Sequence, residues 1–175
     1  DEASVTQGHG TASAGIIVGN WNGVGVGGIA PSARVLPVKI TDDKNETTGN
    51  LISQGVDYAA ANPSVRIILL ETVGTSTSTE EFDSFQSAVA KGKLIIAPAG
   101  NRGEASPFSP ASSFDALGGA GLIVGAHDGA GNRSFFSNGA QGHEANFITA
   151  PGEKILAASN LSDDAYFRVT GTSMA

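Results

Sequence analysis

The 175-residue sequence contains no cysteine and few aromatic residues. The absence of cysteine excludes thiol catalysis, thiolate metal ligands and disulfide bonds, but it does not fix the compartment. Aromatic residues make up 6% of the chain and glycine occurs 24 times, which predicts tight turns and close packing of small residues. No apolar run approaches the roughly 20 residues that cross a bilayer as a helix.

Positive charge is also scarce, since 10 Lys and Arg residues stand against 17 Asp and Glu residues for a net charge of −7. This balance argues against nucleic acid or an anionic membrane as a partner. The length suffices for one globular domain with a sizeable core. Because the sequence opens on Asp1 without an initiator methionine and ends inside a motif, we expect it to be part of a longer chain.

Apolar patterns predict alternating helices and strands. Helices are expected from Gly8, over residues 50–61, and from a Ser78–Glu81 capping box to Gly92. Short apolar or β-branched runs predict strands at residues 34–40, 65–70, 93–97, 122–126 and 166–169. This alternation predicts one α/β domain with a mainly parallel sheet, in which ligands bind at the carboxyl ends of the strands.

The segment Gly171-Thr172-Ser173-Met174-Ala175 follows a predicted strand and stands at the expected start of a helix. A serine hydroxyl there lies beside backbone N–H groups without intrahelical partners, which favour the negative charge that develops in acyl transfer. The structural alternative is a serine N-cap.

Two other residues could assist such a serine. His9, at the start of a small-residue helix, can be held as a general base, although a single histidine is more often structural. Asn101, after the 93–97 strand, offers an amide donor to an oxyanion. Together the three residues predict acyl-transfer chemistry.

The sequences of two loops partly match other kinds of binding site. Residues 23–28 match G-x-G-x-x-G, but the strand before and the helix after that a dinucleotide site requires are absent. Asp42, Asp43 and Glu46 lack the spacing and the glycine of a helical calcium loop, so we expect a solvated loop.

Several segments, in order, resemble the catalytic segments of subtilisin-like serine proteases (subtilases). They are His9-Gly10-Thr11, Gly100-Asn101 and Gly171-Thr172-Ser173-Met174-Ala175, with Gly28-Ile29-Ala30-Pro31, Val38-Lys39, Phe136-Ser137-Asn138 and Ala150-Pro151-Gly152 between them. The resemblance implies that residues 1–175 form a single partial subtilase catalytic domain, a three-layer α/β fold with helices on both faces of the sheet and incomplete at both ends. Residues 65–68 and 147–152 are also similar to bacterial secreted autotransporter subtilases.

The resemblance implies a serine endopeptidase with His9 as general base, Ser173 as nucleophile and Asn101 as oxyanion donor. It further implies a polypeptide substrate, a monomer, and a secreted or cell-surface location, with no cofactor required for the chemistry. The loop around Asn22, Val24 and Val26 resembles a family calcium loop whose other ligands lie further upstream. Structural calcium is therefore expected only in the full-length domain.

The chain departs from the family pattern at three places. The acidic triad member of the family lies upstream of the histidine, on a strand that this sequence does not contain, and Asp1 falls in the connecting loop instead. Ala12 replaces a common second histidine. Glu71 stands in a segment that in the family usually reads Ser-Leu-Gly or Ser-Trp-Gly and lines the substrate cleft, so it could alter specificity or weaken peptide binding. We expect residues 1–175 alone to fold poorly and to show little peptidase activity.

Two other functions are alternatives to that of a serine endopeptidase. An α/β-hydrolase esterase also has a G-x-S-x-G turn, but its histidine follows the serine, whereas every histidine here precedes Ser173. A catalytically inactive subtilase-like binding domain is the other alternative, and the Glu71 departure is its only support.

Overall fold

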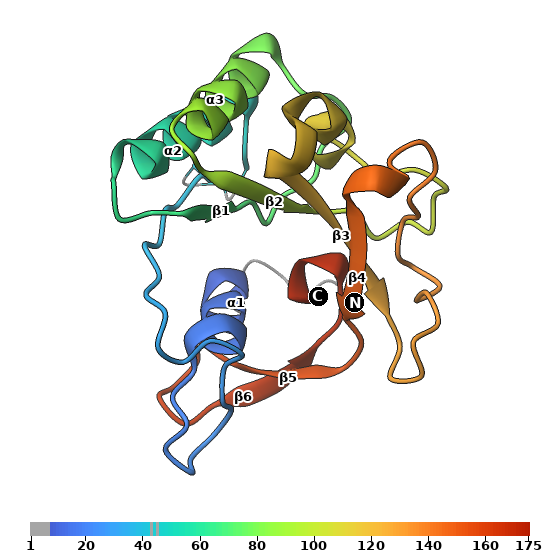
Figure 1. The fold of residues 1–175 in the computed structure, drawn as a ribbon. Coiled ribbons are helices and arrows are strands. Elements are labelled where there is room, and N and C mark those ends of the chain that lie inside the picture. Colours follow the sequence, from blue (N-terminus) through green and yellow to red (C-terminus); the bar gives the residue numbers. More distant parts are fainter. Residues whose placement is uncertain (1–7, 43, 45) are drawn as a thin grey trace.

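The computed structural model describes residues 8–42, 44 and 46–175, which form two sheets with helices around them (Figure 1). The helices are α1 (His9–Val18), α2 (Gly49–Ala61) and α3 (Thr79–Ala90), and the 3₁₀ helices are η2 (Ala111–Ala120), η3 (Glu144–Asn146) and η4 (Thr172–Met174). The strands are β1 (Ile67–Leu69), β2 (Leu94–Pro98), β3 (Gly121–His127), β4 (Phe147–Pro151), β5 (Ile155–Ala158) and β6 (Tyr166–Val169). None of the described helices is long and apolar enough to span a membrane.

The larger sheet is parallel and has the strand order β1-β2-β3-β4. Its register pairs Ile68 with Ile95 and Ile96 with Leu122. Ile95 on β2 and Ile123 on β3 are fully buried, as expected for central strands covered on both faces. The predicted parallel α/β sheet is therefore confirmed.

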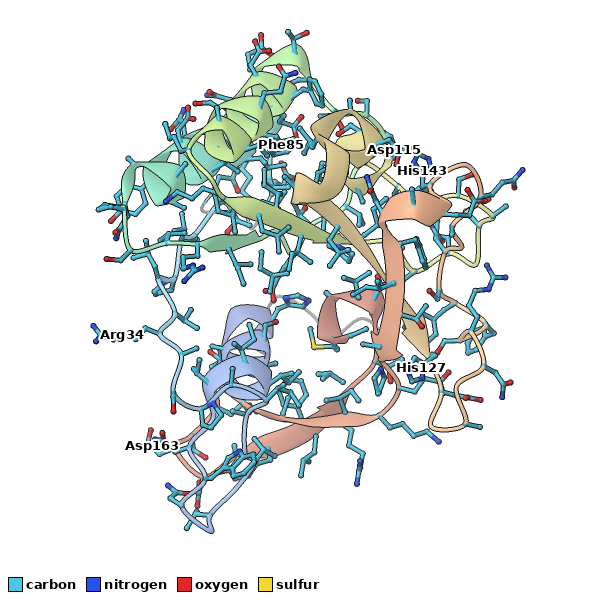
Figure 2. The ribbon with its side chains drawn as sticks, viewed as in Figure 1. Arg34, Phe85, Asp115, His127, His143 and Asp163 are labelled. Carbon is cyan, nitrogen blue, oxygen red and sulfur yellow. The ribbon has the colours of Figure 1, made fainter. Side chains whose placement is uncertain are left out.

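Helices cover both faces of this sheet (Figure 1). On one face α2, α3 and η2 enclose the first core, where Phe85 on α3 (Figure 2) and Phe114 meet edge to face with ring centroids 5.7 Å apart. On the other face α1 and η4 pack with the small antiparallel sheet β5–β6. The second core is built from Ala12, Ala157, Val169 and Met174.

Helix α3 begins at the predicted capping box. The Ser78 hydroxyl accepts a hydrogen bond from the Glu81 backbone N–H, and the Glu81 carboxylate accepts one from the Ser78 N–H. Gly92, at φ 77°, follows the helix in the left-handed conformation. The backbone N–H of Glu80 and the Ser78 hydroxyl lower the pKa of the exposed Glu80 carboxyl.

One strand prediction needs correction. Residues 34–40 form no strand ladder in the structure, and Val35 and Leu36 are 42% and 38% exposed. A β-branched run becomes a strand only when a neighbour takes up its hydrogen bonds, and Pro37 has no N–H to offer. The predicted 166–169 strand is confirmed as β6, which pairs antiparallel with β5 in the small sheet. Strand β4 was not predicted, because this partly exposed strand lacks a continuous apolar run.

Candidate active site

His9 is the first residue of α1, as predicted. It follows Gly8, whose φ of 77° and close approach to Asn160 leave no room for a side chain, since a Cβ would lie 2.6 Å from Asn160. The Ser13 hydroxyl donates a hydrogen bond to the His9 carbonyl, and Ala12 is fully buried in the second core. The start of α1 is thereby fixed.

Ser173 lies in η4, directly after β6. The sequence predicted the start of a helix here, and the described chain forms one 3₁₀ turn from Thr172 to Met174. Met174 is 4% exposed and belongs to the second core, as does Ala12 on α1. Shared packing therefore brings two segments together that are 164 positions apart in the chain.

The imidazole of His9 contacts the Ser173 hydroxyl directly. Nε2 of His9 lies 2.9 Å from Oγ of Ser173, within the range of about 2.6–3.2 Å expected between a nucleophile and its base. Of the three histidines, only His9 makes this contact. His127 Nδ1 lies 2.6 Å from the Asp128 carbonyl, and His143 Nδ1 lies 2.7 Å from the Asp115 carboxylate (Figure 2).

Asn101 is held beside the serine by Thr172. Its Oδ1 accepts hydrogen bonds from the Thr172 N–H at 2.8 Å and from the Thr172 hydroxyl at 2.9 Å. The Thr172 hydroxyl oxygen in turn accepts the Gly100 N–H at 3.2 Å. With Oδ1 engaged in this way, the amide nitrogen Nδ2 remains as the donor of the side chain.

Gly171 keeps open the space between this donor and the nucleophile. A Cβ at Gly171 would lie 3.4 Å from Ser173 Oγ and 3.5 Å from Asn101 Nδ2. A reacting carbonyl group must lie within reach of both the nucleophile and the oxyanion donor. Because Gly171 has no side chain, the space between Ser173 Oγ and Asn101 Nδ2 is left for such a group.

The loop that carries Asn101 is itself fixed by Asn138, a fully buried residue. Its Oδ1 accepts the backbone N–H groups of Arg102 at 3.1 Å and Glu104 at 3.0 Å. Gly100, at φ 109°, fits against Asn138 because a Cβ would lie 2.7 Å from the Asn138 amide. The sequence assigned no role to Thr172 or Asn138, although both belong to segments that resemble the family.

Glu71 reaches the other nitrogen of the His9 ring. Its Oε2 lies 3.3 Å from Nδ1, and its Oε1 is buried without a hydrogen-bond partner among the described residues. The sequence placed Glu71 in the substrate cleft, and the structure brings its carboxylate to His9. Asp1, which the sequence assigned to the connecting loop, lies outside the described residues.

The loop that resembles a family calcium loop is closed by a hydrogen bond of its own, and structural calcium in the full-length domain stays a prediction. The Asn22 Oδ1 accepts the Val24 N–H at 3.0 Å within the loop itself. No three acidic or histidine side chains among residues 8–42, 44 and 46–175 lie close enough together to bind a metal ion. Asp43 lies outside the described residues.

We expect Thr172→Val to lower kcat by about tenfold to a hundredfold with little change in KM. The substitution removes the hydroxyl that bonds Asn101 and leaves the buried Gly100 N–H unpaired, each worth about 1–3 kcal/mol. Steady-state peptide hydrolysis by the full-length protein measures the effect. Thr172→Ser, which keeps the hydroxyl, is the matched control. Equal kcat values for the valine variant and the wild type would show that Thr172 does not orient Asn101.

A serine in contact with an imidazole, with an amide donor beside it, is typical of a serine hydrolase. A family model described as "Subtilase family" matches residues 1–175. The chain belongs to the subtilase family.

Its sequence relatives include one that is named as a serine protease and one that is named as a subtilisin. It is 35% identical over 176 residues to the "Major intracellular serine protease" of Bacillus subtilis (strain 168), covering 100% of this chain and 53% of the relative. It is 34% identical over 169 residues to "Subtilisin Savinase" of Lederbergia lenta, covering 97% of this chain and 59% of that protein. The chain thus spans somewhat more than half the length of these relatives.

Solved structures share the fold. A mutant of the protease domain of PatA superposes with a TM-score of 0.84 at 32% identity, covering 100% of this chain and 62% of that one. The "PatG macrocyclase in complex with peptide" superposes with a TM-score of 0.77 at 27% identity, covering 95% of this chain and 48% of that one. The subtilisin-like α/β fold expected from the resemblance is therefore confirmed.

Proposed function

We propose that residues 1–175 are part of the catalytic domain of a serine endopeptidase that cleaves peptide bonds through an acyl-enzyme. The observation that carries the proposal is the 2.9 Å contact between His9 Nε2 and Ser173 Oγ. The contact joins residues near the two ends of the described chain. The relatives of this chain are named as a serine protease and a subtilisin. The Asn101 amide beside the serine supplies the third element of the site.

The proposed reaction uses these groups in sequence. His9 Nε2 takes the Ser173 Oγ–H proton while Oγ attacks the peptide carbonyl carbon. The oxyanion that forms accepts hydrogen bonds from Asn101 Nδ2 and from the Ser173 backbone N–H. His9 then gives its proton to the leaving amine, and a water molecule, activated by the same imidazole, hydrolyses the acyl-enzyme.

The proposed substrate is a polypeptide. Support comes from the protease names of the sequence relatives and from the peptide in the name of one structural neighbour. The resemblance also leads us to propose a monomer at a secreted or cell-surface location, although one relative is named as intracellular. Fractionation of the producing cells, with detection of the full-length protein, tests the location.

The experiment that tests the activity is covalent labelling of the full-length protein with a serine-directed phosphonate, followed by peptide mapping. We expect the label on Ser173 together with hydrolysis of a casein-derived peptide mixture, and neither in Ser173→Ala. An inactive binding domain predicts peptide binding without label or turnover. The proposal fails if Ser173 stays unlabelled while the protein is folded.

A further inference from the structure

We propose that Asn138 is a positioning residue that holds the oxyanion donor Asn101 in place for catalysis. The inference rests on the proposed function and extends it to a fully buried residue behind the site. Asn101 is exposed and lies in the loop of residues 100–104, which follows β2. An exposed side chain acts as a preorganised donor only when its backbone is fixed before the substrate arrives.

Asn138 makes hydrogen bonds to this loop on both sides of Asn101. Its backbone N–H donates to the carbonyl of Gly100, the residue before Asn101, at 2.9 Å. Its Oδ1 accepts the backbone N–H groups of Arg102 at 3.1 Å and Glu104 at 3.0 Å, which both follow Asn101. A single buried residue thus binds the backbone before and after the donor, and its side chain supplies the bonds after it.

Asn138 is in turn tied to the parallel sheet through Ser137. The Ser137 hydroxyl accepts the N–H of Ala126 in β3 at 2.9 Å and donates to the Asn138 carbonyl at 3.0 Å. Ser137 and Ala126 are both fully buried. Buried polar contacts that are satisfied in this way make a structure more rigid. The loop after β2 is therefore braced by the neighbouring strand β3.

Two backbone hydrogen bonds join the same segments without the Asn138 side chain. The Gly103 N–H donates to the Phe136 carbonyl at 2.6 Å, and the Gly139 N–H donates to the Glu104 carbonyl at 2.9 Å. Loss of the Asn138 Oδ1 therefore leaves the loop attached, but it leaves two N–H groups close to the donor without their acceptor. Because a misplacement of about 1 Å can cost about 10²-fold in rate, we expect a catalytic effect in a folded protein.

A purely structural role for Asn138 makes a different prediction. A residue that only stabilises the fold lowers kcat by the same factor whether or not the Asn101 amide is present. A residue that acts through Asn101 has no further effect once that amide is gone, because the effects of residues that act as a unit are not additive. A double-mutant cycle therefore separates the two roles.

The test is a cycle of Asn138→Leu and Asn101→Ala in the full-length enzyme, read by peptide hydrolysis. Leucine has a similar shape but no acceptor for the Arg102 and Glu104 N–H groups. We expect Asn138→Leu alone to lower kcat by about tenfold to a hundredfold, less than the loss of about 10²–10³-fold for the donor itself, with KM changed less than about twofold. In the Asn101→Ala background we expect a further loss of less than about twofold.

Ser134→Ala is the matched control, because Ser134 is 2% exposed in the same segment and its Oγ has no hydrogen-bond partner among the described residues. Its kcat should equal that of the wild type. Asn138→Asp keeps the oxygen acceptor, and Nδ2 of Asn138 also lacks a partner in the described part of the chain, so this variant should recover part of the rate. If the leucine variant does not fold, Asn138→Ser, which has a shorter side chain, carries the same cycle.

Hydrogen exchange reads the contact without activity. We expect the N–H groups of Arg102 and Glu104 to exchange at least about tenfold faster in Asn138→Leu, while those of β3 keep their wild-type rates. Equal losses of kcat in the two backgrounds, unchanged exchange at Arg102 and Glu104, or a change confined to KM would each overturn the proposal. A wild type whose Ser173 the phosphonate does not label contradicts the proposed function and this role with it, whereas a labelled wild type with an additive cycle contradicts this role alone.

Discussion

Ser173→Ala and His9→Ala are each expected to lower kcat of the full-length enzyme by about 10⁶-fold, the magnitude known for subtilisin, a member of the same family. The reason is the direct contact of 2.9 Å between the two side chains. Without His9 nothing takes the serine proton, and without Ser173 there is no nucleophile. Single-turnover and steady-state hydrolysis of a chromogenic peptide measure the loss.

The double variant should be no slower than either single variant, because the two residues act as one unit. His127→Ala is the matched control, since this histidine contacts the Asp128 carbonyl and not the serine. Its kcat should equal that of the wild type. A His9→Ala variant that retains more than about one hundredth of wild-type kcat would refute the role of His9 as base.

Asn101→Ala is expected to lower kcat by about 10²–10³-fold and to leave KM nearly unchanged, a magnitude taken from the corresponding substitution in subtilisin. The amide oxygen of Asn101 is held by Thr172, so its amide nitrogen is the group free to act on the substrate. An oxyanion exists only near the transition state. Removal of its donor therefore affects kcat and not ground-state binding.

Asn101→Asp gives a sharper comparison. The aspartate keeps an oxygen for the Thr172 hydrogen bonds but replaces the donor with a second acceptor, so it should be at least as slow as the alanine variant. Initial rates over a range of peptide concentrations separate kcat from KM. A raised KM with an unchanged kcat would make Asn101 a substrate-binding residue.

The sequence predicted the elements whose signal is local. The buried apolar runs of β2 and β3 have the composition of strands covered on both faces, and Ser78 with Glu81 marks the start of α3. Residues 34–40 carry a similar strand signal and form no ladder, because pairing depends on a neighbour and not on the segment itself. The antiparallel pairing of β6 with β5 was not predictable for the same reason.

For the site, the sequence identified candidate residues but not all of the side chains that contact them. His9, Asn101 and Ser173 stand in recognisable motifs, and the structure brings them together. Their roles in catalysis remain predictions. The contacts of Thr172 with Asn101 and of Glu71 with His9 join positions far apart in the chain, and no local pattern specifies them.

The two hydrophobic cores described above divide the site between them. His9 and Ser173 are anchored to the core of α1, β6 and η4, whereas Glu71 and Asn101 leave strands of the other core. The link between Asn101 and Thr172 and the contact between Glu71 and His9 cross this boundary. The arrangement of the site therefore depends on how the two cores pack against each other. On heating, we expect a small relative slip of the two cores to disconnect the site while each retains its helices and strands, so peptide hydrolysis should be lost at a lower temperature than the far-UV circular dichroism signal.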